Sequence, residues 1–312
     1  MSRRTPRLFA AALAVGALLL GGCAEKTSND TPAAGGSSAA AAFPVTVGKL
    51  TLEKRPEKIV SLSPSVTEML FAIGAGKQVT AVDDNSNYPP EAPKSDLSGF
   101  QPNAEAIAGK SPDLVVLSND TNKIVDQLTT LKIPVLLTPA ATTLDDTYQQ
   151  VSDLGKLTGH PAEADAVTKK MKDDIAALTK DLPQRAKKLT YYHELGPELY
   201  SATSKTFIGS IYALAGLENI ADPADADGKN GGYPQLSQEV IVKANPDFVF
   251  LADTKCCKQT PETVKARSGW AGVTAVKNNQ IVGLDDDIAS RWGPRVVDLL
   301  KAIVDATAKV PA

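Results

Sequence analysis

The pattern of hydrophobic and polar positions predicts an alternation of short strands and helices over most of the chain. Short apolar runs alternate with segments in which apolar residues return at helical spacing. The predicted strands cover residues 59–62, 79–82, 113–117, 134–137, 188–192, 248–251 and 280–284. The predicted helices include residues 64–73, 124–131, 207–215 and 296–308. Strands separated by helices are typical of parallel α/β packing.

A long stretch without any strand pattern separates two α/β regions. The pattern stays helical over residues 143–183, with one interruption before Pro161, which suits the first turn of a new helix. We therefore expect a helical connector between an N-terminal lobe, 45–142, and a C-terminal lobe, 184–312. The alternative is an ordinary surface helix of one large domain.

Both α/β regions contain the same motif, E-x-I-x-x-x-x-P-D-x-V. It begins at Glu105 in the first region and at Glu239 in the second, 134 residues later. Each copy reads as a short helix, a Pro-Asp turn and an apolar strand. Two copies of one supersecondary unit predict two similar lobes. The predicted fold class is therefore α/β, with two Rossmann-like lobes joined by a long connecting helix and a ligand cleft between them.

The first residues read as a targeting segment. Three arginines precede an apolar run at 8–20, which is shorter than the roughly 20 residues of a membrane-spanning helix. The sequence Leu-Gly-Gly-Cys ending at Cys23 resembles a bacterial lipobox, in which the cysteine is acylated. We expect a signal peptide over 1–22, lipidation at Cys23 and a flexible tether of small residues over 23–44. A plain signal peptide with an incidental cysteine is the alternative.

Composition excludes several classes of protein. Apolar residues make up 43% of the chain, enough for a packed core. The net charge of −3 disfavours a nucleic-acid partner, which normally requires a basic surface. Residues 109–111 mimic the end of a phosphate-binding loop, but Ala104 occupies its first glycine position and the motif precedes a strand. No other enzyme motif is evident, so the sequence predicts a binding protein rather than an enzyme.

Taken together, several motifs resemble one family. These are the lipobox, the two repeated units, KIVSLSPSVTEMLFAIGAG at 58–76, YPPEAP at 88–93 and DDDIASRWGPRVVDLL at 285–300. They resemble the helical-backbone (class III) substrate-binding proteins of ABC importers, which carry ferric siderophores, cobalamin or heme. The resemblance implies a monomer without cofactor, lipid-anchored on the extracytoplasmic face of the cell membrane. Its partners would be an ABC permease with its ATPase and a small-molecule metal chelate.

The resemblance assigns a docking role to two glutamates. In that family one glutamate on each lobe enters an arginine pocket of the permease, and the matching positions are Glu105 and Glu239. A carboxylate on each lobe pairs well with arginine and lets the permease read the spacing of the lobes. Solvated glutamates favoured by the helix dipole are the alternative.

The resemblance also indicates ligand contacts at 285–292, expected as a loop after a strand. A cobalamin-binding member has an Asp and an Arg four residues apart there, which Asp287 and Arg291 match. Trp292 offers an apolar plate for a flat ligand. The alternative is an ion pair that orders the loop. Because neighbouring side chains on an extended segment point to opposite faces, we expect no metal site at the Asp triplet 285–287.

Three further residues are candidate ligand contacts. Tyr88 follows the second predicted strand, and Tyr233 precedes the second docking helix; each would stack on a ligand or pack in a turn. Asn119 ends a strand that faces the predicted cleft.

The cargo predicted from sequence is a ferric siderophore. Gly99 and Ser118 stand where the cobalamin binder presents large aromatic residues, which disfavours cobalamin. Heme is less favoured, because His160 and His193 are the only histidines. Cobalamin and a ligand-free surface sensor or adaptor remain as alternatives.

Cys256 and Cys257 are adjacent in the sequence. Outside the cytoplasm thiols tend to oxidise, so we expect a vicinal disulfide. It would be strained, since neighbouring Cα atoms lie about 3.8 Å apart. The alternative of a thiolate metal pair is disfavoured.

Overall fold

The computed structural model describes residues 43–311, which belong to one compact unit, Ala39–Ala312. The strands in this range are β1 (Val45–Val47), β2 (Leu50–Leu52), β3 (Ile59–Leu62), β4 (Val79–Val82), β5 (Leu114–Leu117), β6 (Val135–Leu137), β7 (Thr190–Glu194), β8 (Glu218–Asn219), β9 (Phe248–Leu251) and β10 (Ile281–Gly283). The helices are α1 (Pro64–Ala72), α2 (Ala104–Ala108), α3 (Ile124–Thr130), α4 (Leu144–Thr158), α5 (Pro161–Thr179), α6 (Phe207–Leu214), α7 (Gln238–Ala244), α8 (Pro261–Lys265), α9 (Thr274–Lys277), α10 (Asp286–Ser290) and α11 (Val296–Thr307). Short 3-10 helices lie at η1 (Ala75–Gln78), η2 (Thr121–Lys123), η3 (Asp222–Asp225) and η4 (Trp270–Gly272).

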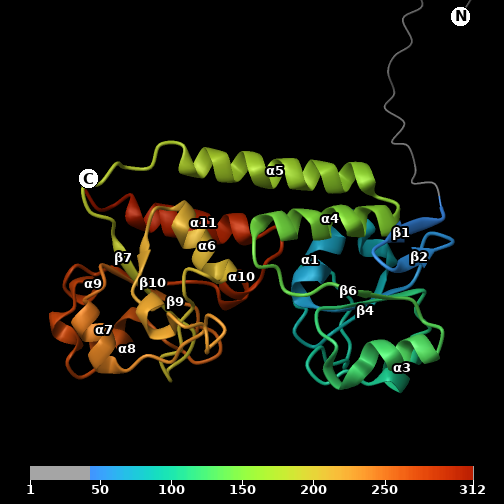
Figure 1. The fold of residues 1–312 in the computed structure, drawn as a ribbon, viewed down its shortest axis with the longest axis horizontal. Helices are drawn as coiled ribbons and strands as arrows, with labels where there is room; N and C mark the ends of the chain where they lie inside the picture. Colours follow the sequence, from blue (N-terminus) through green and yellow to red (C-terminus); the bar gives the residue numbers. More distant parts are fainter. Residues whose placement is uncertain (1–42, 312) are drawn as a thin grey trace, which may run out of the picture. The chain divides into compact units, whose positions relative to one another are not determined.

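Two four-stranded parallel sheets have the same topology (Figure 1). Their strand orders are β4-β3-β5-β6 and β8-β7-β9-β10. In each parallel sheet the strand that comes first along the chain, β3 or β7, lies between the second and the third strands of that sheet, so the direction of winding reverses beside it. At such a reversal the loops that leave the carboxyl ends of the strands diverge, and ligands bind in the crevice they leave. The prediction of two similar α/β lobes is confirmed.

The repeated Pro-Asp turn has the same structural task in both lobes. The Asp113 carboxylate accepts hydrogen bonds from the main-chain N–H groups of Glu57 and Lys58, just before β3, at 2.9 and 3.0 Å. The Asp247 carboxylate accepts from the N–H and hydroxyl of Thr190, at the start of β7, at 2.8 and 3.0 Å. Each aspartate therefore fixes the start of the neighbouring central strand.

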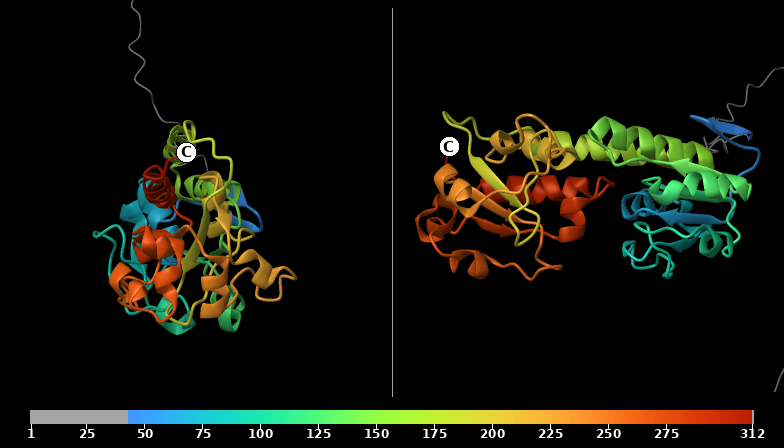
Figure 2. Two further views of the ribbon diagram at one scale, coloured as in Figure 1. Left: turned by 90° about the vertical axis from the view of Figure 1, so that its left-hand side faces the viewer. Right: turned by 60° about the horizontal axis from the view of Figure 1, so that its bottom comes forward.

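Helix α5 packs against both lobes with a single face. Ala164 is buried in the core of the N-terminal lobe and Met171 in that of the C-terminal lobe, while Val167 contacts both. Along its length α5 contacts α4, which packs on α1, and α11, which packs on α6 (Figures 1 and 2). The apolar periodicity predicted from the sequence is thus the face that joins the lobes. The connector contains two helices, α4 and α5, divided before Pro161 as the sequence predicts.

Some features differ from the sequence-based prediction or lie outside it. The antiparallel hairpin β1–β2 was not predicted. The expectation that residues 285–292 form a loop is wrong in part, because Asp286–Ser290 forms helix α10. The signal peptide 1–22, Cys23 and all but the end of the tether 23–44 lie outside the described residues. Between residues 43 and 311, no helix is long and apolar enough to cross a bilayer.

Candidate functional site

A small polar hollow lies at the carboxyl ends of β3, β4 and β5, and we name it the strand-end cup. Its volume is about 60 Å³. Its lining residues are Leu62, Pro64, Asp83, Asn85, Gly99, Phe100, Ser118 and Asn119. Apart from the Asp83 carboxyl, its polar groups are neutral amides and hydroxyls. Burial raises the pKa of Asp83 above its usual value, and the Ser86 hydroxyl donates a hydrogen bond to this carboxyl.

Gly99 is a glycine because the Asp83 carboxyl lies against it. A Cβ at position 99 would lie 2.7 Å from Asp83 Oδ2, closer than real Cβ contacts. A large aromatic side chain therefore does not fit at this position while Asp83 keeps its place. The next residue, Phe100, supplies an aromatic side chain instead, and 73% of it is exposed at the cup.

Asn119 lies in the strand-end cup, just after β5, and its predicted contact with a ligand stays a prediction. Its Nδ2 donates to the Gly99 carbonyl at 3.4 Å, and its Oδ1 accepts from the Thr121 N–H and hydroxyl at 3.2 and 2.6 Å. Because the amide oxygen is already occupied, the side chain is left with one free N–H to offer a ligand.

Four exposed aromatic side chains stand on loops that leave strand carboxyl ends. Tyr88 and Phe100 follow β4, Tyr200 follows β7 and Tyr233 follows β8. A bridge between Tyr200 and Gln235 links the loops of the last two. Sequence reasoning missed Phe100 and Tyr200. The available signal was an aromatic residue in a polar loop after a strand, which is where α/β sheets bind ligands.

Arg291 is buried by internal bonds instead of being open to a ligand. It is 8% exposed, and its Nη1 donates to Glu68 Oε1 at 2.8 Å. Its Nη2 donates to the Asn85 carbonyl at 2.9 Å and to Asp287 Oδ1 at 2.8 Å. The structure thus shows the ion pair that was the alternative interpretation. A ligand contact at Arg291 or Asp287 stays a prediction.

Glu68 is the main functional candidate that sequence reasoning missed. This residue of α1 is 3% exposed and also accepts from Arg295, whose Nε and Nη2 donate at 2.9 and 2.6 Å. The guanidinium carbon of Arg295 lies 4.0 Å from the ring centroid of Tyr88. The signal in the sequence was a carboxylate among the apolar positions of a predicted helix, since a buried charge requires a partner.

Residues 291–295, which we name the clasp, lie closely against α1 and α4. The Trp292 N–H donates to Ser65 Oγ at 3.2 Å, and its indole Nε1 donates to Gln150 Oε1 at 3.0 Å. The Thr147 hydroxyl donates to the Trp292 carbonyl at 3.0 Å. A Cβ at Gly293 would lie 3.3 Å from both Glu68 Oε2 and the Ser65 carbonyl, so a larger residue there would push the clasp away from α1. Trp292 packs in this junction, and the expected stacking of its ring on a flat ligand stays a prediction.

Tyr88 and Asn119 line different hollows. With Phe71, Pro89, Glu91 and Arg295, Tyr88 borders a cavity of about 280 Å³ beside α1. Tyr233 lines neither hollow. The cup itself is lined only by residues of the N-terminal lobe, so the cleft between the lobes stays a prediction.

Each member of the Asp triplet has its own structural task. Asp285 caps α10 by accepting from the N–H groups of Asp287 and Ile288 at 3.0 and 3.2 Å. Asp286 accepts from the main-chain N–H groups of Lys255 and Cys256 at 2.9 and 3.0 Å. The expectation that this segment is extended is wrong, because Asp286 and Asp287 begin a helix. Over the described range, no group of three or more His, Cys, Asp or Glu residues is arranged to hold a metal ion.

Asp287 is held ionised by its neighbours. Burial opposes ionisation, but bonds from Lys255 at 2.8 Å and Asn87 at 3.1 Å, with the charge of Arg291, lower the pKa of Asp287. Cys256 and Cys257 on the adjoining loop are free thiols, so the vicinal disulfide stays a prediction.

Neither histidine lines the strand-end cup. His193 is fully buried, its Nδ1 lies 2.8 Å from the Tyr212 hydroxyl, and burial lowers the pKa of His193 to about 4. His160 lies beside Arg55 and Gln78, between α4 and α5.

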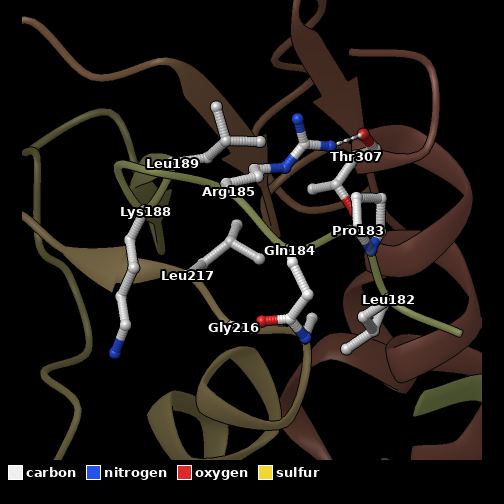
Figure 3. A pocket seen from close by; sticks show the side chains of 10 residues that line it. Leu182, Pro183, Gln184, Arg185, Lys188, Leu189, Gly216, Leu217 and Thr307 are labelled. Carbon is white, nitrogen blue, oxygen red and sulfur yellow. Dashed lines mark hydrogen bonds between the residues drawn. The ribbon is translucent and has the colours of Figure 1, made fainter. Parts of the chain in front are cut away.

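Another hollow, of about 210 Å³, lies near the starts of β7 and β8 (Figure 3). It is lined in part by Arg185, whose Nη2 donates to the carbonyls of Thr307 and Val310 at 3.1 and 2.9 Å. These bonds cap the carbonyl end of α11. Because this hollow faces the amino ends of the strands, it is a poor candidate for the ligand site of a parallel sheet.

The two docking candidates occupy the same position in equivalent helices. Glu105 and Glu239 are exposed, each in the first turn of its helix, α2 or α7. The preceding caps are also equivalent: Asn103 accepts from the Ala106 N–H at 2.9 Å, and Ser237 from the Val240 N–H at 3.2 Å. Within residues 43–311, neither glutamate forms an ion pair.

Comparison with known proteins agrees with this geometry. A family model described as periplasmic binding protein matches residues 59–288. YvrC of Bacillus subtilis, an uncharacterised ABC transporter substrate-binding lipoprotein, is 29% identical over 95% of this chain and 95% of its own length. A cobalamin-binding protein of Halobacterium salinarum is 34% identical over 86% of this chain and 75% of its own length. The structure of a possible iron-binding protein from Staphylococcus epidermidis matches with a TM-score of 0.70 at 28% identity, covering 82% of this chain and 100% of that one.

The matched region extends from β3 into α10 and therefore contains both sheets, the cup and both repeated units. Two parallel-sheet lobes of equal topology, joined by a helix and marked by one exposed glutamate each, fit a protein that captures a small molecule for another protein. The chain belongs to the periplasmic binding protein family, as a class III substrate-binding protein of an ABC transporter.

Proposed function

We propose that the chain captures a corrinoid outside the cytoplasm and delivers it to an ABC permease. The observation that carries this choice is the chemistry of the strand ends. Four exposed aromatic rings stand on loops at the strand ends of the two lobes, and one of them, Phe100, lines a cup that contains amide and hydroxyl groups. A corrinoid has a broad apolar face fringed by neutral amides, which such a surface can stack on and hydrogen-bond.

The charges near the strand ends oppose an anionic cargo. Arg291 is neutralised by Glu68 and Asp287, and Lys255 by Asp285 and Asp287. A catecholate siderophore would have to break these ion pairs to reach a cation. The relative named as a cobalamin-binding protein supports the same choice. The sequence-based argument against cobalamin, the lack of aromatics at Gly99 and Ser118, is weakened by Phe100, which lines the same cup.

A ferric siderophore is the second candidate. The observation that favours it is the likeness to a possible iron-binding protein at 28% identity. Neutral hydroxamate chelates would avoid the conflict with the paired cations.

The remaining roles complete the proposal. Lipidation at Cys23 anchors the chain on the extracytoplasmic face, and Glu105 and Glu239 dock a monomer onto the permease. Tyr88, Asn119, Tyr233, Asp287, Arg291 and Trp292 remain the proposed ligand contacts, together with Phe100 and Tyr200. The chain binds its cargo and does not transform it.

The test is a titration of the full chain carrying Cys23→Ser with cyanocobalamin, a ferric hydroxamate, a ferric catecholate and heme. Isothermal calorimetry gives affinities that the colour of the ligands does not distort. We expect saturable binding of cyanocobalamin with a Kd below about 1 μM. Saturable binding of the ferric hydroxamate alone would favour the second candidate. No binding of any of them would favour a ligand-free sensor or adaptor.

A further inference from the structure

We propose that Glu68 is a positioning residue that fixes the separation between the two lobes and the shape of the loop beside the strand-end cup. It does so by binding Arg291 and Arg295 of the clasp at the same time. The consequence of this separation for transport rests on the proposed function, whereas the effect of Glu68 on the separation does not.

The charges at the clasp depend on this one carboxylate. The Glu68 carboxylate accepts three hydrogen bonds from the clasp. Arg291 Nη1 donates at 2.8 Å, and Arg295 Nε and Nη2 donate at 2.9 and 2.6 Å. Arg295 pairs with no other carboxylate among residues 43–311. Arg291 also pairs with Asp287, but Lys255 shares that carboxylate. Without the charge of Glu68, two nearly buried guanidinium groups would lose their common partner.

The clasp also holds the loop that borders the cup. Three side chains of the C-terminal lobe contact residues 85–88 of this loop. Arg291 donates to the Asn85 carbonyl at 2.9 Å, and Asn85 lines the cup. Asn87 donates to Asp287 at 3.1 Å, and Arg295 stacks on Tyr88 at 4.0 Å. Glu68 orients both arginines and so acts on the loop through them.

The same contacts join the parts of the chain that carry the docking glutamates. Glu68 and residues 85–88 belong to the lobe with Glu105, whereas the clasp belongs to the lobe with Glu239. Helices α4 and α5 also connect the lobes, since α5 packs on both α4 and α11. The packed helices still connect the lobes when the charge of Glu68 is lost. We therefore expect the lobe separation to take a wider range of values rather than one new value.

The experiment measures the lobe separation directly, without any cargo. The full chain with Cys23→Ser, Cys256→Ser and Cys257→Ser receives spin labels at Ala106→Cys and Lys243→Cys, exposed positions on α2 and α7. Double electron–electron resonance then gives the distribution of distances. Glu68→Gln keeps the size of the side chain and removes its charge. The matched control is Asp305→Asn, which breaks the exposed ion pair of Asp305 with Lys301 on α11.

We expect a narrow distribution in the parent and in Asp305→Asn, and a clearly broader one in Glu68→Gln. An equally narrow distribution in folded Glu68→Gln overturns the proposal. If that variant does not fold, Glu68→Asp and Arg295→Lys replace it, since both keep the charges but weaken the two hydrogen bonds between Arg295 and Glu68. Broadening in these supports the proposal, and no broadening in either overturns it.

A second readout separates positioning from simple stability. In folded Glu68→Gln at low temperature, we expect the affinity for cyanocobalamin to fall by about tenfold, with Glu68→Asp regaining part of it. Failure of the parent to bind any cobalamin would contradict the proposed cargo, while the distance distributions would still decide the role of Glu68.

Discussion

Glu105 and Glu239 stand at the same point of two equivalent helices, each exposed in the first turn behind a side chain that caps the helix. We predict that the double variant Glu105→Ala and Glu239→Ala abolishes uptake of the cargo and leaves its affinity unchanged. The reason is that neither carboxylate lines the cup and both are exposed, so both are free to meet arginines of a permease. The measurement pairs uptake into cells with calorimetry on the purified variant.

The chain offers a close control for this experiment. Glu262 is also an exposed glutamate in the first turn of a capped helix, α8, but it lies outside the repeated motif. Glu262→Ala should leave uptake intact. A double variant that has lost its affinity for the cargo would contradict the docking role, because the glutamates would then act on the ligand site.

The positions of most strands and the similarity of the two lobes could be predicted because their causes are local. The run Phe248–Leu251 is completely apolar and becomes β9 with the same bounds. The Pro-Asp turns before β5 and β9 were visible as a repeat, since each aspartate performs the same bonding task in its own lobe. The hairpin β1–β2 was missed because strands of three residues are too short to show a period.

The clasp could not be predicted because its partners are distant along the chain. Glu68 and Arg291 are separated by 223 positions, and no local pattern indicates which arginine meets which carboxylate. Asp287 and Arg291, which the resemblance indicates as ligand contacts, form an ion pair with each other in the structure. Three consecutive aspartates do not by themselves indicate a helix, so the pattern did not predict α10, which Asp285 caps.

Phe100→Ala should weaken cargo binding. Phe100 has the greatest exposure of the exposed aromatic side chains of the described residues, and it lines the cup beside Asn119. Loss of its contact should cost about 1 kcal/mol, or roughly fivefold in Kd. Calorimetric titration with cyanocobalamin measures the change. The control is Leu131→Ala, at the exposed end of α3, which should bind like the parent; equal affinities of the two variants would remove Phe100 from the site.

Asp113→Ala and Asp247→Ala should destabilise the two lobes to a similar degree. Asp113→Ala leaves the N–H groups of Glu57 and Lys58 without their partner, and Asp247→Ala does the same to the N–H and hydroxyl of Thr190. The cost of each is about 2 kcal/mol. Urea unfolding of the two variants measures the change in the free energy of unfolding. Asp96→Ala, whose side chain is 95% exposed, is the control and should change that energy by less than about 0.5 kcal/mol. An effect confined to one lobe would contradict the equivalence of the two turns.

The free energy of unfolding of the parent should decrease as the pH rises, and Asp253→Asn should make this decrease smaller. Asp253 is fully buried, and neither carboxyl oxygen has a hydrogen-bond partner among the described residues. Burial, and next the charge of Glu194, raise the pKa of Asp253 to about 7. Between the unfolded value of 3.8 and about 7 the folded chain therefore holds a proton that the unfolded chain has released. Its contribution to stability is complete at low pH and is lost as the pH rises through this window.

The measurement for Asp253 is the free energy of unfolding in urea at pH 5 and pH 8. The parent should lose stability between these values through this group, and Asp253→Asn should lose less. A variant with the same loss as the parent would show that Asp253 is ionised in the folded protein at both values.

His193→Gln should have the opposite effect at acid pH. Burial lowers the pKa of His193 to about 4, from 6.5 in the unfolded chain, so the unfolded chain binds the extra proton between these values. The contribution of His193 to stability is present above pH 6.5 and is lost as the pH falls toward 4. Glutamine removes this titration and can still hydrogen-bond the Tyr212 hydroxyl.

Because the titration of Asp253 changes the stability in the opposite direction over the same pH window, both proteins are compared in the Asp253→Asn background. In that background, the free energy of unfolding of the protein with His193 should fall between pH 6.5 and pH 4.5. The free energy of unfolding of the His193→Gln variant should fall less. An equal fall in both proteins would mean that His193 is protonated in the folded chain.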